Sequence, residues 1–242
     1  MDHPTHIGEL PGVPPPDLRA GTFVVVPAYN ESAGLGLVLQ ELVDAYPHVA
    51  VVDDGSTDST LAIARQLAPF VVRHPINRGQ GAALQTGIEF ALRRGARYIV
   101  TFDADGQHRV EDIARLLVPL GAGECDITLG SRFLGAVSAM PRTRWVLLKL
   151  AIGWTRLVSQ LPLTDAHNGL RAFTRRAAEG IELSMDRMAH ASELLDCIRR
   201  MNLPYREVPV HIRYTDYSLA KGQRSHDAFR VLFDYLMGRM IR

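Results

Sequence analysis

The chain has 242 residues, of which 47% are hydrophobic and 22% are charged. This composition excludes a disordered chain and a fibrous protein, and the length suits one large domain or one domain with an appendage. Two cysteines, Cys125 and Cys197, exclude a disulfide framework and favour a reducing, cytosolic setting. No stretch approaches 18 uncharged apolar residues, and the N-terminus lacks a signal-peptide pattern, so no membrane-crossing helix is expected.

The net charge of +1 hides an asymmetry between the two parts of the chain. Residues 1–140 carry 10 basic and 16 acidic side chains, whereas residues 141–242 carry 17 basic and 10 acidic ones. An acidic half can hold a metal ion, and a basic half can bind phosphates or lie on an anionic membrane. Acidic side chains in surface loops explain the asymmetry equally well, so composition alone leaves both interpretations open.

The order of predicted elements indicates an α/β fold. Residues 1–21, rich in proline and without an apolar period, are expected to form a flexible lead-in. Short β-branched runs then predict strands over 22–27, 49–52, 70–73, 98–102 and 126–130. Helical periodicity predicts helices over 33–46, 59–68, 79–94 and 110–120. Such alternation predicts a mainly parallel sheet covered on both faces, with ligands bound beyond the carboxyl ends of its strands.

Polar clusters follow the first two predicted strands. The first strand runs into Pro27-Ala28-Tyr29-Asn30-Glu31, and the second runs into Asp53-Asp54-Gly55-Ser56-Thr57-Asp58. Asp58 or Ser59 is expected to cap the next helix. Two adjacent acids directly after an apolar strand suit hydrogen bonds to the base and ribose of a nucleotide, although helix capping alone also accounts for carboxylates at this place.

The third segment is rich in small residues and precedes a long helix. Its sequence, Asn77-Arg78-Gly79-Gln80-Gly81-Ala82-Ala83, lets a backbone approach a ligand at a helix N-terminus, where anions are favoured. The glycine spacing is not that of a dinucleotide-binding fingerprint, and the Lys-Ser/Thr of a P-loop is missing.

The fourth predicted strand ends in Asp103-Ala104-Asp105-Gly106-Gln107-His108. Alternate residues of an extended segment point the same way, so both carboxylates can face one ligand. Two like charges at that distance repel each other unless a cation lies between them, and oxygen ligands suit Mg²⁺ or Mn²⁺. A solvated turn is the alternative interpretation, and His108 is interpreted as a loop residue rather than as a metal ligand.

Taken together, these motifs resemble those of the family 2 glycosyltransferases of GT-A fold. The resemblance rests on VVVPAYNE, VVDDGSTDST, NRGQGAALQTG and FDADGQH, and it continues through GSRF at 130–133 and DAHNGLRAF at 165–173. The last two motifs are most similar to the polyprenyl-phosphate branch, which includes the dolichol-phosphate mannose synthases and more usually has Ser where this chain has Asn168. The resemblance covers most of residues 22–222. It implies a nucleotide-sugar half over 22–133, an acceptor half over 134–222 and a C-terminal amphipathic helix over 223–242.

The resemblance also implies a role for individual residues. Those expected to bind the nucleotide sugar are Pro27, Ala28, Tyr29, Glu31, Asp53, Asp54, Gly79, Gln80, Asp103, Ala104, Asp105, Arg213 and Lys221. The metal, Mg²⁺ or Mn²⁺, is expected on Asp103, Asp105 and Gln107. Arg132 and Arg171 are expected to face the acceptor phosphate, and together with Asp105 they are the expected catalytic residues.

The implied activity is inverting transfer of a hexose, of mannose or glucose type, from a GDP- or UDP-linked sugar to a polyprenyl phosphate. Such an acceptor needs no general base, because a phosphate monoester with a second pKa near ~6 is already largely dianionic at neutral pH. The alternative is a soluble glycosyltransferase that acts on a saccharide hydroxyl in surface-polysaccharide synthesis, and Glu193 is then the candidate base. A catalytically silent scaffold and a nucleotidyltransferase are more distant alternatives. Nucleic acid is not expected as a partner.

A lipid acceptor requires access to a membrane. Over 142–161, apolar residues recur at helical spacing, while Arg142, Lys149 and Arg156 recur every seven residues on another face. A basic amphipathic helix of this kind either lies in a membrane interface or packs on the core. A second amphipathic candidate covers 228–241. The protein is therefore expected in the cytoplasm, peripheral at the inner face of the membrane, held there directly or by a small membrane partner protein.

Overall fold

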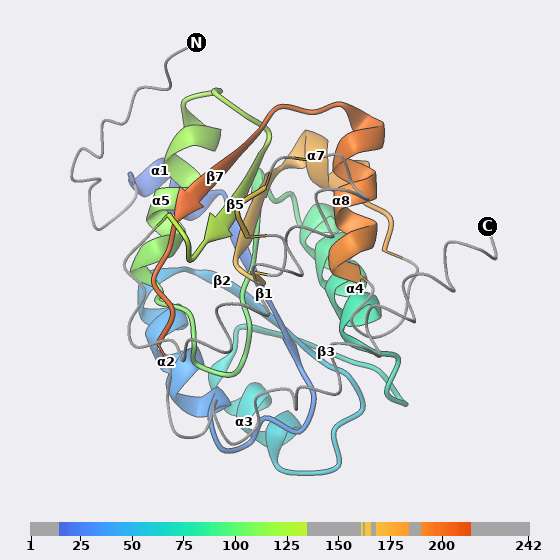
Figure 1. Ribbon diagram of the computed structural model, residues 1–242. Helices are drawn as coiled ribbons and strands as arrows, with labels where there is room; N and C mark the ends of the chain where they lie inside the picture. Colours follow the sequence, from blue (N-terminus) through green and yellow to red (C-terminus); the bar gives the residue numbers. More distant parts are fainter. Residues whose placement is uncertain (1–14, 135–160, 162, 166–167, 184–189, 214–242) are drawn as a thin grey trace, which may run out of the picture.

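The computed structural model describes residues 15–134, 161, 163–165, 168–183 and 190–213. Within these residues the strands form one seven-stranded sheet of order β3-β2-β1-β4-β6-β5-β7 (Figure 1). The strands are β1 Thr22–Ala28, β2 His48–Asp53, β3 Phe70–Arg73, β4 Tyr98–Thr101, β5 Ile127–Ser131, β6 Arg171–Thr174 and β7 Tyr205–Pro209. The pairing is parallel except at β6, which runs antiparallel to both of its neighbours, β4 and β5. The predicted α/β fold with a mainly parallel sheet is confirmed.

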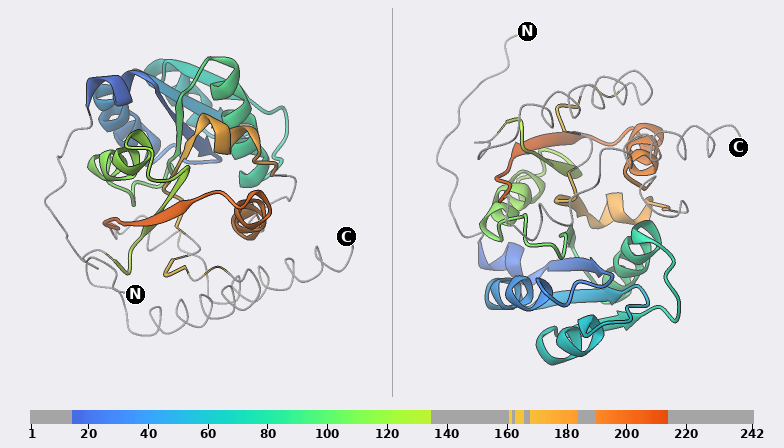
Figure 2. Two further views of the ribbon diagram at one scale, coloured as in Figure 1. Left: turned by 90° about the horizontal axis from the view of Figure 1, so that it is seen from above. Right: turned by 60° about the horizontal axis from the view of Figure 1, so that its bottom comes forward.

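Helices cover both faces of this sheet. They are α1 Pro16–Ala20, α2 Leu35–Ala45, α3 Thr60–Leu67, α4 Gln80–Arg93, α5 Glu111–Gly121, α7 Arg175–Glu179 and α8 His190–Met201. One core cluster joins α1, α2, α3 and α5 to one face, and a second joins α4, α7 and α8 to the other. The views in Figures 1 and 2 show this division, with α2 and α5 on one side and α4 and α8 on the other.

The central strand β1 explains why the sheet is built around this sequence. Every residue of TFVVVPA is buried, because β1 lies between β2 and β4 and is covered from both faces. Alternate valines therefore enter different cores: Val24 and Val26 belong to the cluster with α2, and Val25 belongs to the cluster with α4. Full burial of one such side chain stabilises the fold by about 1.5–3 kcal/mol. The strand ends at Ala28, and the polar residues that follow are presented at the sheet edge.

The structure differs from the sequence prediction at the N-terminal lead-in. Residues Pro16–Ala20 form the short helix α1, with Pro16 in its first turn, where the missing proline N–H costs no hydrogen bond. Leu18 is buried and packs so closely on Gly121 of α5 that a Cβ there would lie 2.7 Å from Leu18. The packed structure thus begins before residue 22. The predicted amphipathic segments over 142–161 and 223–242 lie outside the described residues, apart from Leu161.

Candidate active site

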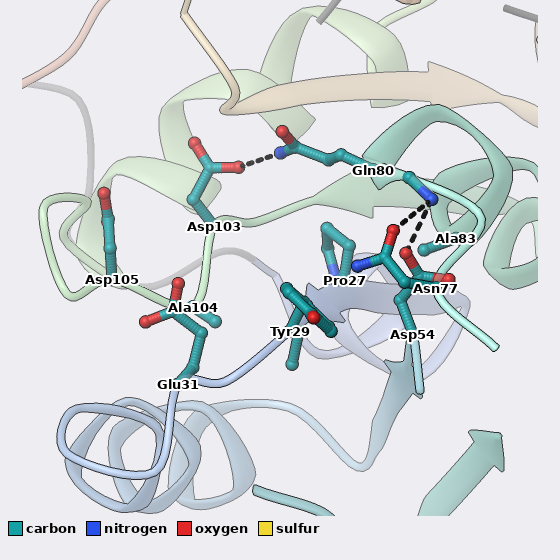
Figure 3. A pocket seen from close by; sticks show the side chains of 12 residues that line it. Pro27, Tyr29, Glu31, Asp54, Asn77, Gln80, Ala83, Asp103, Ala104 and Asp105 are labelled. Atoms are coloured by element: carbon teal, nitrogen blue, oxygen red, sulfur yellow. Dashed lines mark hydrogen bonds between the residues drawn. The ribbon is translucent and has the colours of Figure 1, made fainter. Parts of the chain in front are cut away.

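A pocket of about 320 Å³ opens at the carboxyl ends of β1 and β4, beside the N-terminus of α4. The described residues that line it are Pro27, Ala28, Tyr29, Glu31, Asp54, Asn77, Gly79, Gln80, Ala83, Asp103, Ala104 and Asp105 (Figure 3). Ten of these twelve are predicted nucleotide-sugar ligands, and the structure brings them together. Asn77 and Ala83 complete the lining without having been predicted individually.

The pocket is strongly acidic. Four carboxylates line it, and none of its described lining residues is a lysine or an arginine. In Figure 3, Glu31, Asp103 and Asp105 lie toward one end and Asp54 with Asn77 toward the other, with Tyr29 between them. Burial raises the pKa of Asp105, and the neighbouring Asp103 carboxylate raises it further. A nucleotide diphosphate is itself an anion, so this pocket suits one only when a cation accompanies it.

The residues at the end of β4 fit a hard divalent cation. Asp103 and Asp105 supply two carboxylates, while the described residues bring no three His, Cys, Asp or Glu side chains together as a metal cluster. Mg²⁺ is commonly held by one or two carboxylates together with substrate phosphates and water, which is the set available here. Gln107 does not line the pocket; its N–H donates to Asp105 Oδ1 at 3.0 Å and shapes the turn between them.

Asp103 is fixed by two polar neighbours. Gln80 Nε2 donates to Asp103 Oδ1 over 3.1 Å, the contact drawn across the pocket in Figure 3. His108 Nε2 lies 3.1 Å from Asp103 Oδ2, and the His108 ring is 4% exposed and packs edge-on against Phe102. His108 is therefore a buried support of Asp103, whereas the sequence interpretation took it for a loop residue. Orientation of a carboxylate by outer partners of this kind tunes its affinity for metal.

The two adjacent acids after β2 have different positions. Asp54 lines the pocket, and its carboxylate accepts hydrogen bonds from the N–H groups of Arg78 at 2.9 Å and Gly79 at 2.7 Å. Its Oδ1 also lies 2.7 Å from Nδ1 of the buried His74. Asp53 is fully buried, does not line the pocket and has Arg73 Nε 3.8 Å away as its nearest cation. Neither Asp53 oxygen has a hydrogen-bond donor among the described residues.

The N-terminus of α4 faces the pocket through a turn that requires glycine. Gly79, the residue before the helix, has φ of 91°, a left-handed conformation that other residues adopt only at a cost. The Gly79 N–H is held by Asp54 and by Asn77 Oδ1 at 3.1 Å, which fixes the start of the helix at Gln80. The aligned N–H groups of a first helical turn favour an anion, so the predicted diphosphate site has a local counterpart. Tyr29 presents a ring that is 42% exposed beside it.

Hydrogen bonds join the loop after β1 to the loop after β2. Asn30 has φ of 53°, and its side-chain oxygen accepts from the N–H of Thr57 at 2.9 Å. Asp58 accepts from the N–H groups of Ser32 at 3.2 Å and of Thr60, the first residue of α3, at 2.9 Å. The N-cap residue itself is Ser59, whose side chain makes no capping hydrogen bond. Desolvation acts to raise the pKa of Asp58, but hydrogen bonds from Thr60 and Ser32 outweigh it and lower the pKa to about 2. These contacts hold Tyr29 and Glu31 in place.

The predicted acceptor arginines are not among the described residues that line the pocket, and both interact with Asp165. Arg132 follows β5, and its Nε donates to Asp165 Oδ2 over 2.6 Å. Arg171 begins β6, is 5% exposed, and interacts electrostatically with the carboxylates of Asp103 and Asp165. Burial lowers the pKa of Arg171, although these two carboxylates act to raise it; a guanidinium stays cationic at neutral pH. The structure thus brings both arginines together, next to the metal-binding motif.

The remaining predicted residues are placed less directly. The Arg213 N–H donates to the carbonyl of Gln107 over 2.8 Å, while its guanidinium lies 3.4 Å from Glu41 and not in the pocket lining. Lys221 lies outside the described residues. Glu193, the candidate base, is 5% exposed in the first turn of α8 and does not line the pocket. Among the described residues, no helix has both the length and the apolar character that a membrane crossing needs.

Several residues around the site have functions that single motifs did not indicate. Gly169 packs directly on the Asp103 carboxylate, Asp165 holds Arg132, and His74 connects Asp54 to Thr86 of α4 through a 2.9 Å contact. Gly169 and Asp165 belong to the 165–173 motif, which was the available signal. His74 follows β3 with no motif of its own, so its contact with Asp54 is visible only in three dimensions.

Comparison with known proteins gives the family. The sequence profile of Glycosyl transferase family 2 matches residues 23–180. The chain is 35% identical over 234 residues to the polyprenol monophosphomannose synthase of Mycolicibacterium smegmatis, covering 92% of this chain and 87% of that protein. It is 32% identical over 241 residues to the UDP-N-acetylglucosamine–dolichyl-phosphate N-acetylglucosaminyltransferase of Methanococcus voltae, covering 90% and 96% respectively.

A solved structure shows the same fold. The glucosyl-3-phosphoglycerate synthase of Mycobacterium tuberculosis, in complex with Mn²⁺, UDP-glucose and phosphoglyceric acid, aligns with a TM-score of 0.70 at 19% identity. The alignment covers 96% of this chain and 85% of that chain. The chain therefore belongs to glycosyl transferase family 2 and is a glycosyltransferase of GT-A fold.

Proposed function

We propose that this glycosyltransferase moves a hexose, with inversion, from a nucleotide-diphosphate sugar to a polyprenyl phosphate, and that it requires Mg²⁺ or Mn²⁺. The observation that carries the proposal is that Arg132 donates a hydrogen bond to Asp165, while the buried Arg171 interacts electrostatically with both Asp165 and Asp103, a carboxylate of the acidic pocket. This gives one site a place for a cation-bound diphosphate and, beside it, two guanidinium groups for a second anion. One aligned relative is named as a polyprenol monophosphomannose synthase and another as a dolichyl-phosphate N-acetylglucosaminyltransferase, which supports a polyprenyl-phosphate acceptor here.

On the donor side, the nucleoside binds against Tyr29 and Asp54, and the diphosphate lies between the N-terminus of α4 and Asp105. Asp103 and Asp105 would hold the divalent ion, and the Gln107 N–H would support Asp105. Such an ion would neutralise the diphosphate and stabilise it as a leaving group. The protein fixes that geometry in advance, because Gln80 and His108 already orient Asp103. Gly79 and its hydrogen bonds to Asp54 fix the start of α4 in the same way.

On the acceptor side, Arg132 and Arg171 orient a phosphate that is already dianionic, so no protein group needs to remove a proton. A guanidinium can hold two phosphate oxygens in a fixed fork, which aligns one of them with the sugar carbon. Glu193, the candidate base of the alternative activity, is buried and is not among the described residues that line the pocket. A saccharide hydroxyl, by contrast, needs a positioned base.

A lipid acceptor also requires that the protein reach a membrane surface. We assign this contact to the basic segment over 142–161, which lies outside the described residues, or to a membrane partner. Replacing Arg142, Lys149 and Arg156 together is expected to reduce co-sedimentation with anionic vesicles, with each charge contributing about 1 kcal/mol at most. Equal sedimentation of the variant and the wild type would assign the attachment to another part of the chain or to a partner.

A panel of donors and acceptors tests the proposed function. GDP- and UDP-linked hexoses are each combined with a short-chain polyprenyl phosphate or with free saccharides, in Mn²⁺, Mg²⁺ or a chelator. Metal-dependent product is expected on the lipid phosphate alone. Transfer to a saccharide hydroxyl would establish the alternative activity, and transfer that persists in the chelator would remove the metal from the proposal.

A further inference from the structure

Arg132, which follows β5, and Arg171, in β6, both interact with the carboxylate of Asp165, Arg132 through hydrogen bonds and Arg171 electrostatically. Asp165 Oδ2 accepts two hydrogen bonds from Arg132, one from its backbone N–H at 3.1 Å and one from Nε at 2.6 Å. Asp165 also interacts electrostatically with the buried guanidinium of Arg171. Charges therefore alternate along Asp103, Arg171, Asp165 and Arg132, from the metal-binding motif to the end of β5. Asp165 is the only one of these four for which neither the sequence motifs nor the comparisons give a role.

Hydrogen bonds to Glu207 fix the backbone that carries the Asp165 carboxylate. Glu207 of β7 accepts hydrogen bonds from the N–H of Thr164 at 2.8 Å and from the N–H of Asp165 at 3.0 Å. Glu207 also accepts a hydrogen bond from the Thr164 hydroxyl at 2.8 Å, and Thr164 Oγ1 lies 2.6 Å from Ser131 Oγ. The backbone that carries Asp165 is thus tied to β7 and to the end of β5. A carboxylate on such a support can set the position of a longer, more flexible partner.

The burial of Asp165 makes this contact strong. Its side chain is 1% exposed, and that of Arg132 is 11% exposed, so water screens the pair poorly. An arginine side chain gives up rotamer freedom when it is ordered, and a short bond to a fixed carboxylate removes that freedom before any ligand binds. This hydrogen bond joins Nε, on the inner edge of the Arg132 guanidinium, to Oδ2 of Asp165. The position of Arg132 is therefore determined by Asp165.

We propose that Asp165 is a positioning residue, which acts through Arg132 to hold the acceptor-phosphate site in its binding geometry. The inference rests on the proposed function, since it assigns Arg132 to a lipid phosphate. Asp165 touches neither donor nor acceptor in this account. Its loss should therefore raise the KM for the acceptor and lower kcat, while the affinity for the nucleotide stays nearly unchanged.

The test is a double-mutant cycle between Asp165→Asn and Arg132→Ala, read out as kcat and KM for a short-chain polyprenyl phosphate. Asparagine keeps the shape and one oxygen acceptor but removes the charge. We expect Asp165→Asn to lower kcat/KM by about 10- to 100-fold, the effect of losing a charged hydrogen bond. In the Arg132→Ala background, the same change should cost less than about threefold, because its target has gone.

Asp126→Asn is the matched control. The carboxylate of Asp126, the residue before β5, forms an ion pair with Arg176 of α7, the helix that follows β6. The hydrogen bond from Arg176 is the main cause that lowers the pKa of Asp126. This variant also breaks an arginine–carboxylate pair, but it should leave kcat/KM within about twofold of the wild type. Thermal unfolding and calorimetric titration with UDP, GDP and Mn²⁺ establish that each variant folds. If Asp165→Asn does not fold, Glu207→Gln replaces it in the double-mutant cycle, because Glu207 accepts the hydrogen bond from the backbone N–H of Asp165 and so positions its carboxylate.

Three outcomes are distinguishable. Non-additive losses, with nucleotide affinity retained, support the inference. Additive losses, or no loss in Asp165→Asn, overturn it while the proposed function stands, because the wild type still glycosylates the lipid phosphate. A wild-type enzyme that transfers no sugar to any lipid phosphate overturns the proposed function and, with it, this inference.

Discussion

Gly169 lies against the carboxylate of Asp103 with no space for a side chain. A Cβ at position 169 would come within 2.0 Å of Asp103 Oδ2 and 2.6 Å of its Cγ. The carbonyl of Gly169 accepts a 2.7 Å hydrogen bond from Thr101 Oγ1, so the segment before β6 is fixed to the end of β4. The segment that leads into Arg171 is therefore in direct contact with Asp103, a predicted metal ligand.

Gly169→Ala should weaken metal-dependent nucleotide binding. The added methyl group cannot fit without moving Asp103 or the β6 backbone, and a displaced ligand holds the cation poorly. We expect UDP or GDP affinity in Mn²⁺ to fall by about 10- to 100-fold, as for lost outer support of a metal ligand, measured by calorimetric titration. Gly36→Ala is the control, because its nearest neighbour would be Ile63 at 3.9 Å. Unchanged metal-dependent binding in Gly169→Ala would contradict the assignment of Asp103.

Asp105→Asn should affect stability and binding in opposite directions. Burial and the Asp103 charge raise the pKa of Asp105, so without metal its ionised form destabilises the fold at neutral pH. The amide removes that repulsion, and the Tm in a chelator should rise by a few degrees, about 2–4 °C for each 1 kcal/mol. Metal-dependent nucleotide binding should be lost. A variant that retains metal-dependent binding would exclude Asp105 as a ligand.

Two substitutions of Arg171 distinguish its contribution to fold stability from its contribution to sugar transfer. Arg171→Ala removes a buried cation that interacts electrostatically with Asp103 and Asp165, and we expect it to lower the free energy of unfolding by about 3–5 kcal/mol. Arg171→Lys keeps the charge but loses the fork geometry. It should retain slow donor hydrolysis by water while transfer to the lipid phosphate falls roughly a hundredfold, or ~3 kcal/mol. Equal loss of hydrolysis and transfer in Arg171→Lys would assign Arg171 to the donor or to the fold.

The lowered pKa of Asp58 predicts part of the acid sensitivity of the fold. Its pKa falls from an ordinary 3.8 to about 2 because hydrogen bonds from Thr60 and Ser32 outweigh desolvation. A lowered pKa stabilises the fold fully above the unfolded value, and this contribution is lost as the pH falls through about 2. Asp58→Asn should therefore lose less free energy of unfolding than the wild type between pH 4 and pH 2, measured in urea. Asp44→Asn, at an exposed site on α2, is the control; equal slopes in Asp58→Asn and wild type would contradict the account.

The sequence predicted the nucleotide-binding half well because its signals are local. The first four strands are apolar runs bounded by polar turns, and the segment after each of them contributes to the pocket, so ten predicted residues line it. The sequence did not indicate which residue of the adjacent pair Asp53-Asp54 lines the pocket. Successive side chains of a strand point to opposite faces, and the sequence does not say which face meets the ligand. The structure selects Asp54 and buries Asp53.

The acceptor side was less predictable because it depends on distant pairing. Strand β6 has four residues and inserts antiparallel between β4 and β5, a register set by contacts far apart in the chain. The bond between Arg132 and Asp165 spans 33 positions and leaves no periodic signal. The helix at Pro16–Ala20 was missed because a proline-rich context indicates irregular chain, whereas Leu18 gains enough burial to order one turn.

The most direct test of the central claim is a competition for one sugar between two forms of the same lipid. A labelled nucleotide-diphosphate hexose is incubated with the wild-type enzyme, Mn²⁺, and equal amounts of a short-chain polyprenyl phosphate and the corresponding polyprenol. Our account predicts that the label enters only the glycosyl phosphoryl lipid, because Arg132 and Arg171 bind a phosphate and no base activates a hydroxyl. Label in the polyprenyl glycoside, at a rate comparable to that on the phosphate, would contradict it.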